Sequence, residues 1–141
     1  MARGDVVVFN TGKENLMDGT HDIDTHTFKV AICDNTTAPT ATTATPALAD
    51  FTQVGTGGTY ISGGTALTLT WVESGGTVTW AFSNSPTWAS DAGNDVDAYW
   101  GIVYNDTNVG KEAVAYIDLG GPVDMTAGAL TINAGTLFTL A

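Results

Sequence analysis

The sequence predicts one all-β domain, an antiparallel β-sandwich or a jelly-roll-like barrel of about eight or nine short strands with one short N-terminal helix. Three observations lead to this prediction. First, apolar residues alternate with polar ones in several short stretches of the chain. Second, glycine-rich turns separate these stretches. Third, 24 of the 141 residues are Thr, a residue that favours strands. Strands do not alternate with helical patterns, so a parallel α/β sheet is disfavoured.

The N-terminal third begins with a predicted strand at residues 5–9. A short helix should follow, capped by Asn10 or Thr11 and ended by Gly19. Residues 25–33 alternate strictly, which predicts a strand with one apolar face and one face toward solvent. Its two sets of side chains are Phe28, Val30 and Ile32 against Thr27, Lys29 and Ala31.

A hairpin around Gly75-Gly76 is the clearest local signal in the chain. Its large side chains fall on one face, which we expect to pack on the core: Leu67, Leu69, Trp71, Val78, Trp80 and Phe82. Further strands are expected at residues 98–104, 113–119, 130–132 and 137–140. Gly120-Gly121-Pro122 should end the second of these four.

The chain is expected to form a single β-rich domain over residues 1–141, with two unusual segments. Residues 1–10 are predicted to be extended, and residues 34–50 to form a long loop or arm because no large apolar residue precedes Leu48. The second segment either reaches a neighbouring subunit or is a mobile surface loop. The candidate partner-binding residues are Arg3, Asp5, Pro39, Pro46 and Trp88, the last from a polar stretch.

The charge balance limits the partners. The formal net charge is −11, and Arg3, Lys13, Lys29 and Lys111 are the four cations. Binding to nucleic acid needs clustered Lys and Arg, so we exclude it. An acidic surface keeps a chain soluble or meets a basic partner. No apolar stretch is long enough to cross a membrane, and the start lacks the features of a signal peptide.

No residue pattern indicates catalysis or a cofactor. Cys33 lies in a predicted strand and is expected to be a buried, inert thiol, and neither a Gly-x-Ser-x-Gly elbow nor a phosphate-binding loop is present. The weak metal candidates are Asp91, Asp95 and Asp97, with a second acidic group at residues 22–26. The alternative is that these Asp residues bond to their own backbone in turns.

Several segments resemble a family of small virion proteins of tailed bacteriophages. In that family a short helix ends in Asp-Gly-Thr and a Lys-Val-Ala strand follows, as at Asp18-Gly19-Thr20 and Lys29-Val30-Ala31. The stretch Tyr60-Ile61-Ser62-Gly63-Gly64 and the later Trp88 and strand 98–104 match in order. The resemblance spans most of the chain apart from residues 36–46.

The resemblance implies a non-enzymatic virion protein, most simply a capsid decoration or cement protein. Such a protein would bind the major capsid protein on the outer capsid surface, self-associate as a homotrimer and stabilise the head. The alternative is a tail or tail-fibre component that recognises the host or binds carbohydrate, for which exposed Trp side chains would be needed. Core packing is the competing explanation for Trp71, Trp80 and Trp100.

Overall fold

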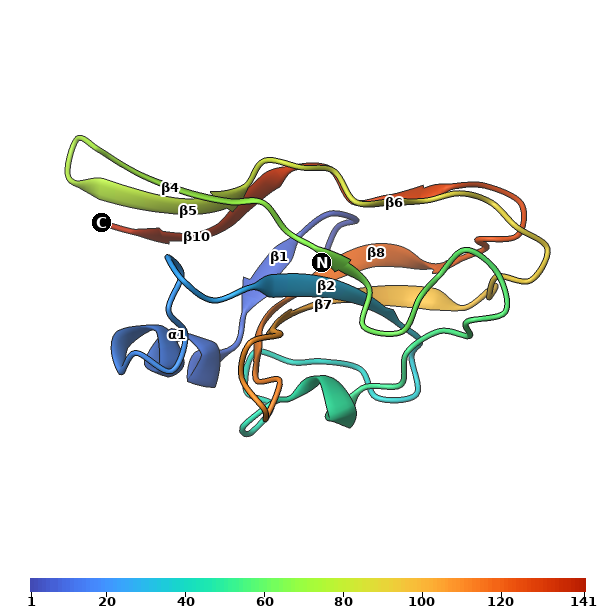
Figure 1. Ribbon diagram of the computed structural model, residues 1–141, viewed down its shortest axis with the longest axis horizontal. Coiled ribbons are helices and arrows are strands. Elements are labelled where there is room, and N and C mark those ends of the chain that lie inside the picture. The colour runs from blue at the N-terminus through green and yellow to red at the C-terminus, as the bar shows by residue number, and fades with distance from the viewer.

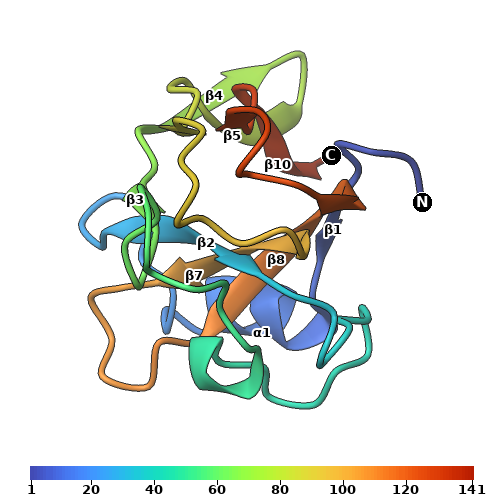
Figure 2. The ribbon, with the colours of Figure 1, turned by 90° about the vertical axis from the view of Figure 1, so that its right-hand side faces the viewer.

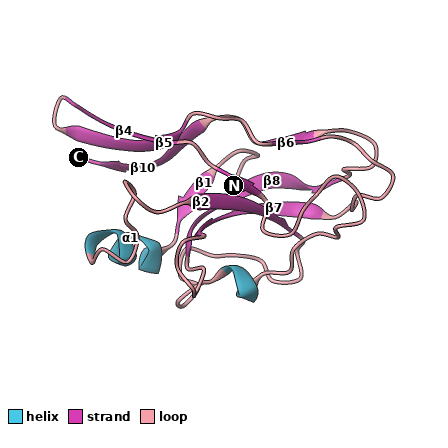
Figure 3. Cartoon of the chain, viewed as in Figure 1, coloured by secondary structure: helices cyan, strands magenta, loops and turns pink.

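Three layers make up the fold in the computed structural model, which describes residues 1–141 (Figure 1). A five-stranded sheet lies in the middle, smaller sheets cover one of its faces, and helix and loop cover the other (Figure 3). The elements are β1 Val6–Val8, α1 Asn10–Met17, β2 Phe28–Cys33, the 3₁₀ helix η1 Leu48–Asp50, β3 Thr65–Ala66, β4 Leu69–Ser74, β5 Thr77–Phe82, β6 Thr87–Trp88, β7 Ala98–Asn105, β8 Ala113–Val123, β9 Leu130–Thr131 and β10 Gly135–Leu140.

All strand pairs are antiparallel. The central sheet has the order β1-β8-β7-β2-β3, a second sheet has the order β10-β5-β4, and β6 pairs with β9. No sheet closes on itself, so the predicted sandwich with a short N-terminal helix is confirmed and the barrel alternative is wrong. The two-residue strands β3 and β6 were not expected, because two residues are too few to show an alternating pattern.

The main core lies between the central and the three-stranded sheets. Phe28 of β2 meets Trp80 of β5 edge to face, with ring centroids 5.3 Å apart. Phe82 and Ile32 are buried beside them, at 3% and 0% exposure. Phe28 and Ile32 of β2 and Trp80 and Phe82 of β5, which the alternating pattern assigned to the core face, therefore join the two sheets.

The second face of the central sheet is also buried. A cluster of eight buried residues lies there, formed by Phe9, Ala31, Cys33, Phe51, Ile102, Tyr104, Ala113 and Tyr116. Its aromatic members come from outside the sheet as well as from it, since Phe9 packs on Tyr116 and on Phe51. The prediction that one side of residues 25–33 faces solvent is thus wrong from Ala31 onward.

Residues 34–50 provide part of this second cover. The segment forms a long loop with a bridge at Ala47 and is tied to the body by backbone hydrogen bonds, including Asn10 N–H to the Ala41 oxygen at 2.9 Å and Ala113 N–H to the Pro46 oxygen at 2.8 Å. Pro39 and Pro46 are buried. The segment is therefore a loop packed on its own chain and not an extended arm.

The N-terminal segment is only partly extended. Residues 6–8 are β1, which pairs with β8, and Asn10 already belongs to α1. The N-cap of α1 is Phe9, which makes no side-chain cap, so the expected capping by Asn10 or Thr11 is wrong. Gly19, with φ of 85°, follows the helix end as predicted.

One other local prediction, the end of a strand at Gly120-Gly121-Pro122, is also wrong. β8 continues through Gly120-Gly121-Pro122 to Val123, because an irregularity in its pairing with β7 between Ala98 and Trp100 accommodates the glycines. Residues 22–26 form a turn, which is the alternative expected for this acidic group, and the predicted strand over residues 25–33 begins only at Phe28. The carboxylate of Asp22 accepts hydrogen bonds from the backbone of Asp24 and Thr25, which holds that turn.

The β4–β5 hairpin forms as predicted. Gly75 and Gly76 have φ of 61° and 85°, the conformation that a two-residue hairpin turn requires and that glycine adopts without strain. Trp80 is buried at 2% exposure, but Trp71 opposite it is 44% exposed. Only the half of the hairpin near Phe82 packs on the core, and the half near the turn projects beyond the central sheet (Figure 1).

This difference between paired tryptophans gives a first test. Trp80→Ala should lower the free energy of unfolding by about 3 to 5 kcal/mol, because a buried aromatic side chain is replaced by a cavity. Trp71→Ala in the opposite strand should cost less than about 1.5 kcal/mol, since much of that side chain is already in water. Urea unfolding followed by circular dichroism measures both, and equal losses would contradict the packing described.

Candidate functional site

The N-terminal segment is exposed but follows a defined path along β8. Gly4 N–H donates to the Asp118 oxygen at 2.7 Å, and Asp118 N–H donates to the Asp5 oxygen at 3.0 Å. The Asp5 carboxylate accepts a hydrogen bond from Ala2 N–H at 2.7 Å. Backbone pairing thus extends β1 toward the chain terminus and holds residues 2–5 at the rim of the sandwich (Figure 2).

Arg3 lies at the edge of a groove beside this segment. The groove has a volume of ≈ 420 Å³ and is bordered by Arg3, Gly4 and Val6, by residues 117–119 of β8 and by residues 130–136 before and within β10. Its floor includes Ile117, Leu130 and Ile132. The Arg3 side chain packs over Gly120, where a Cβ atom would lie 2.9 Å from the Arg3 Cβ. The absent side chain at Gly120 therefore leaves room for Arg3.

Arg3 and Asp5 are thus the two predicted partner-binding residues that the structure leaves accessible. Trp88 is buried at 4% exposure and packs on Tyr60, with ring centroids 6.1 Å apart. Pro39 and Pro46 are buried under the loop that contains them. The surfaces of Trp88, Pro39 and Pro46 are therefore used inside the chain, and a contact of these residues with a partner stays a prediction.

The carboxylates of Asp91 and Asp95 in the acidic loop at residues 91–97 accept hydrogen bonds from backbone N–H groups. Asp91 accepts from Gly93 N–H at 2.8 Å, and Asp95 accepts from Gly55 N–H at 3.0 Å and Val96 N–H at 2.8 Å. These backbone hydrogen bonds hold the pKa of Asp95 below its usual value, with Gly55 the largest cause. Asp91, Asp95 and Asp97 do not converge as metal ligands, and neither does the group at residues 22–26.

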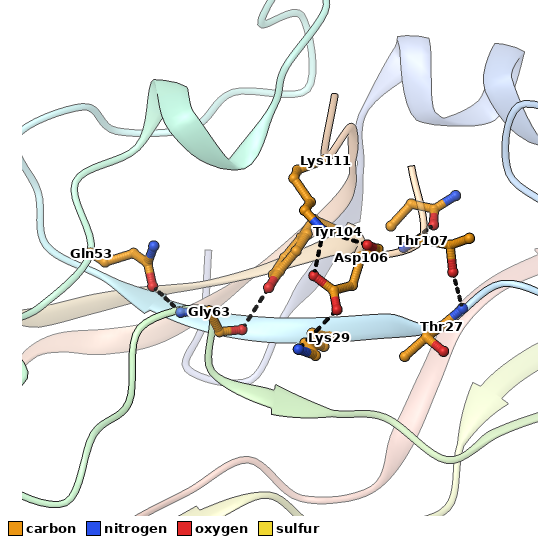
Figure 4. A network of polar contacts seen from close by, with 9 residues as sticks. Thr27, Lys29, Gln53, Gly63, Tyr104, Asp106, Thr107 and Lys111 are labelled. Carbon is orange, nitrogen blue, oxygen red and sulfur yellow. Dashed lines mark hydrogen bonds and ion pairs between the residues drawn. The ribbon is translucent and has the colours of Figure 1, made fainter. Parts of the chain in front are cut away.

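A polar network across β2 and β7 occupies two of the four cations (Figure 4). Asp106 forms ion pairs with Lys29 and Lys111, each at 2.8 Å. Its hydrogen bonds with Lys111 and then Lys29 lower the pKa of the Asp106 carboxyl group. The network joins the loop after β7 to the central sheet and leaves Arg3 and Lys13 without ion-pair partners.

The remaining reactive groups are buried. Desolvation raises the pKa of the Cys33 thiol to about 12, which disfavours the nucleophilic thiolate and agrees with the inert role expected from the sequence. Burial lowers the pKa of His21 to about 4, opposed by the charges of Glu112 and Asp18. The amide of Asn105 lies 3.3 Å from Nδ1 of His21 and 2.8 Å from Nδ1 of His26. The Asn105 amide and the two His side chains therefore make their contacts within the chain.

An exposed apolar surface on the projecting hairpin was not predicted. Trp71 is 44% exposed, Val72 62%, Val78 37% and Leu140 of the neighbouring β10 50%. Alternation in the sequence placed Trp71 and Val78 on the core face, and they do share the face of Trp80. The sequence contains no signal for where the central sheet stops beneath this face, so their exposure follows from tertiary structure alone.

Comparison with known proteins gives no identification: no family model, no curated protein and no solved structure matches this chain. None of the helices is both long and apolar enough to cross a bilayer.

The burial of His21 predicts a pH dependence of stability. The unfolded chain takes up a proton on this residue near pH 6.5, but the folded chain does so only near pH 4, so the unfolded state binds more protons between these values. The free energy of unfolding should fall by roughly 3 kcal/mol between pH 7 and pH 4. Urea titrations at several pH values measure this fall.

His21→Gln should flatten the profile between pH 7 and pH 5, above the range in which the lowered pKa values of Asp95 and Asp106 also reduce stability. His26→Gln should retain the fall over that range because His21 is still present. A steep profile in His21→Gln would show that another group is responsible.

Proposed function

We propose that the chain is a non-enzymatic structural protein of a tailed bacteriophage, a decoration protein that binds the major capsid protein on the outer capsid surface and stabilises the head. The resemblance of its sequence to small virion proteins suggests this class. The observation that carries the proposal is the N-terminal segment, which is exposed, held in place by β8 and adjacent to a groove with an apolar floor.

The charge distribution supports a protein partner at this segment. In a chain with net charge −11, Arg3 is a cation without an internal ion pair, and it lies beside exposed apolar and polar groove atoms. Interfaces are enriched in Arg, whose long side chain contributes both apolar contact and charge-assisted hydrogen bonds. An acidic patch of a capsid subunit would pair with Arg3, while the apolar floor would be buried on binding.

The fold suits stabilisation of a lattice. A rigid sandwich buried on both faces of its central sheet can bridge neighbouring capsid subunits without unfolding. A ligand that binds only the assembled lattice shifts the equilibrium toward assembly. The homotrimer that the resemblance implies stays a prediction.

Cryo-electron microscopy of undecorated capsids of the parent phage mixed with the purified protein tests the function. Regular added density on the outer surface would support decoration. Bare capsids, with the protein on tails or free in solution, would contradict it.

Arg3→Glu tests the contact itself. We expect at least a tenfold loss of capsid affinity, because the charge that meets the partner is reversed, with little change in the thermal unfolding temperature. Lys13→Glu is the matched control, since Lys13 is also exposed and unpaired but lies on α1. An equal loss in both variants would indicate general charge repulsion, and no loss in Arg3→Glu would exclude this segment as the contact.

One observation favours the alternative of a tail or tail-fibre component that binds carbohydrate. Trp71 is 44% exposed on a strand with exposed Thr70, and an exposed indole ring can stack on a sugar. Binding to a panel of host surface glycans, measured for the natural chain and for Trp71→Ala, separates this function from decoration. Glycan binding that requires Trp71, together with bare capsids, would favour the alternative.

A further inference from the structure

β4 is the longest regular free edge in the structure. Of the outer strands of the two larger sheets, β1 has three residues, β3 has two, and the register of β10 shifts between Thr136 and Phe138. β4 has six residues and pairs with β5 without interruption along one side only. It contains neither the Lys, the Pro nor the bulge with which proteins protect such edges.

The hairpin turn determines which backbone groups of this edge are free. In a two-residue hairpin the residues that flank the turn, here Ser74 and Thr77, form a hydrogen-bonded pair. Hydrogen-bonded and non-hydrogen-bonded pairs then alternate along the ladder. Leu69, Trp71 and Glu73 consequently direct their N–H and C=O groups away from β5.

Charge permits two copies to meet at this edge. Two chains with net charge −11 repel each other over most of their surface, but Glu73 is the single charged residue of the three strands β10, β5 and β4. Its carboxylate accepts a hydrogen bond from Gly76 N–H in its own turn at 2.8 Å. Trp71 and Val72 expose apolar surface on the two faces of the edge.

We propose that β4 pairs with β4 of a second copy of this chain, antiparallel and with Trp71 opposite Trp71. In this register Leu69 of each copy lies opposite Glu73 of the other. The free N–H and C=O groups of Leu69, Trp71 and Glu73 therefore all face free backbone groups of the second copy. The two Glu73 carboxylates are then four residues apart along the strands. This separation is longer than the screening length of roughly 8 Å at physiological salt, so the repulsion between the two charges is weak.

The pairing joins two three-stranded sheets into one six-stranded sheet. The two Trp71 rings become neighbours on one face, and the Val78 side chains continue that apolar surface. The contact is two-fold and self-complementary, as in most homodimers. A homotrimer of the decoration protein would need a different surface, so this pairing is independent of capsid binding.

Cysteine cross-linking tests the register. Thr70 of one copy should face Val72 of the other in a non-hydrogen-bonded pair, with Cα atoms about 4.5 Å apart, a separation that a disulfide spans. A mixture of Thr70→Cys and Val72→Cys chains should give cross-linked dimers under mild oxidation, whereas either variant alone should give few. The natural Cys33 is fully buried and does not interfere.

Val109→Cys controls for random collision, because Val109 is 99% exposed in a loop away from β4. Cross-linking in the mixture at the level of Val109→Cys would overturn the proposal.

Sedimentation equilibrium tests the association. The natural chain should form dimers, and Trp71→Lys should raise the dissociation constant at least tenfold because it places two positive charges side by side. Thr139→Lys adds the same charge to exposed β10 on the opposite face and should leave the constant within about twofold. A monomeric natural chain, or a dimer unaffected by Trp71→Lys, would overturn the pairing. A monomer that still decorates capsids would leave the proposed function intact.

Discussion

The central sheet has apolar side chains on both faces, and the rest of the structure depends on covering both. On one side Phe28 and its neighbours require the three-stranded sheet, whose Trp80 meets Phe28 edge to face. On the other side Ala31 and Cys33 require the cover that includes Phe9 and Phe51. A sheet covered on one face only would leave a large apolar area in water, at a cost of about 25 cal/mol for each Å².

This double cover explains the long loop at residues 34–50. A segment of Thr and Ala cannot form a core of its own, but it can lie on a sheet when its backbone groups find partners. The hydrogen bonds from Asn10 and Ala113 to its carbonyl groups provide such partners. The segment that composition marks as irregular is therefore part of the packed structure, and the surfaces left for association lie elsewhere.

Those surfaces differ in character. The N-terminal rim presents an unpaired cation next to an apolar groove, whereas the hairpin edge is almost uncharged and presents backbone groups and apolar side chains. In an acidic protein the first favours an acidic patch on another protein, and the second favours a copy of the same chain. Under the two proposals made above, these separate surfaces would allow one chain to bind a capsid lattice and a second copy of itself at the same time.

The sequence by itself determined the local structure. Alternation predicted the longer strands and the faces of their side chains but not the two-residue strands β3 and β6. Gly75-Gly76 predicted the hairpin, and Asp residues in turns were identifiable because their carboxylates bond to nearby backbone.

Only the tertiary structure decided which faces are covered. Trp88 lies in a polar stretch but is buried on Tyr60, and Trp71 lies on a core face but is exposed, because burial depends on what the rest of the chain places opposite a side chain. The tertiary arrangement likewise determines that a distant loop covers Ala31 and that no strand of the chain pairs with the outer edge of β4. Periodicity assigns a side chain to a face of a strand, but the presence of a layer over that face comes from contacts between residues far apart in the sequence.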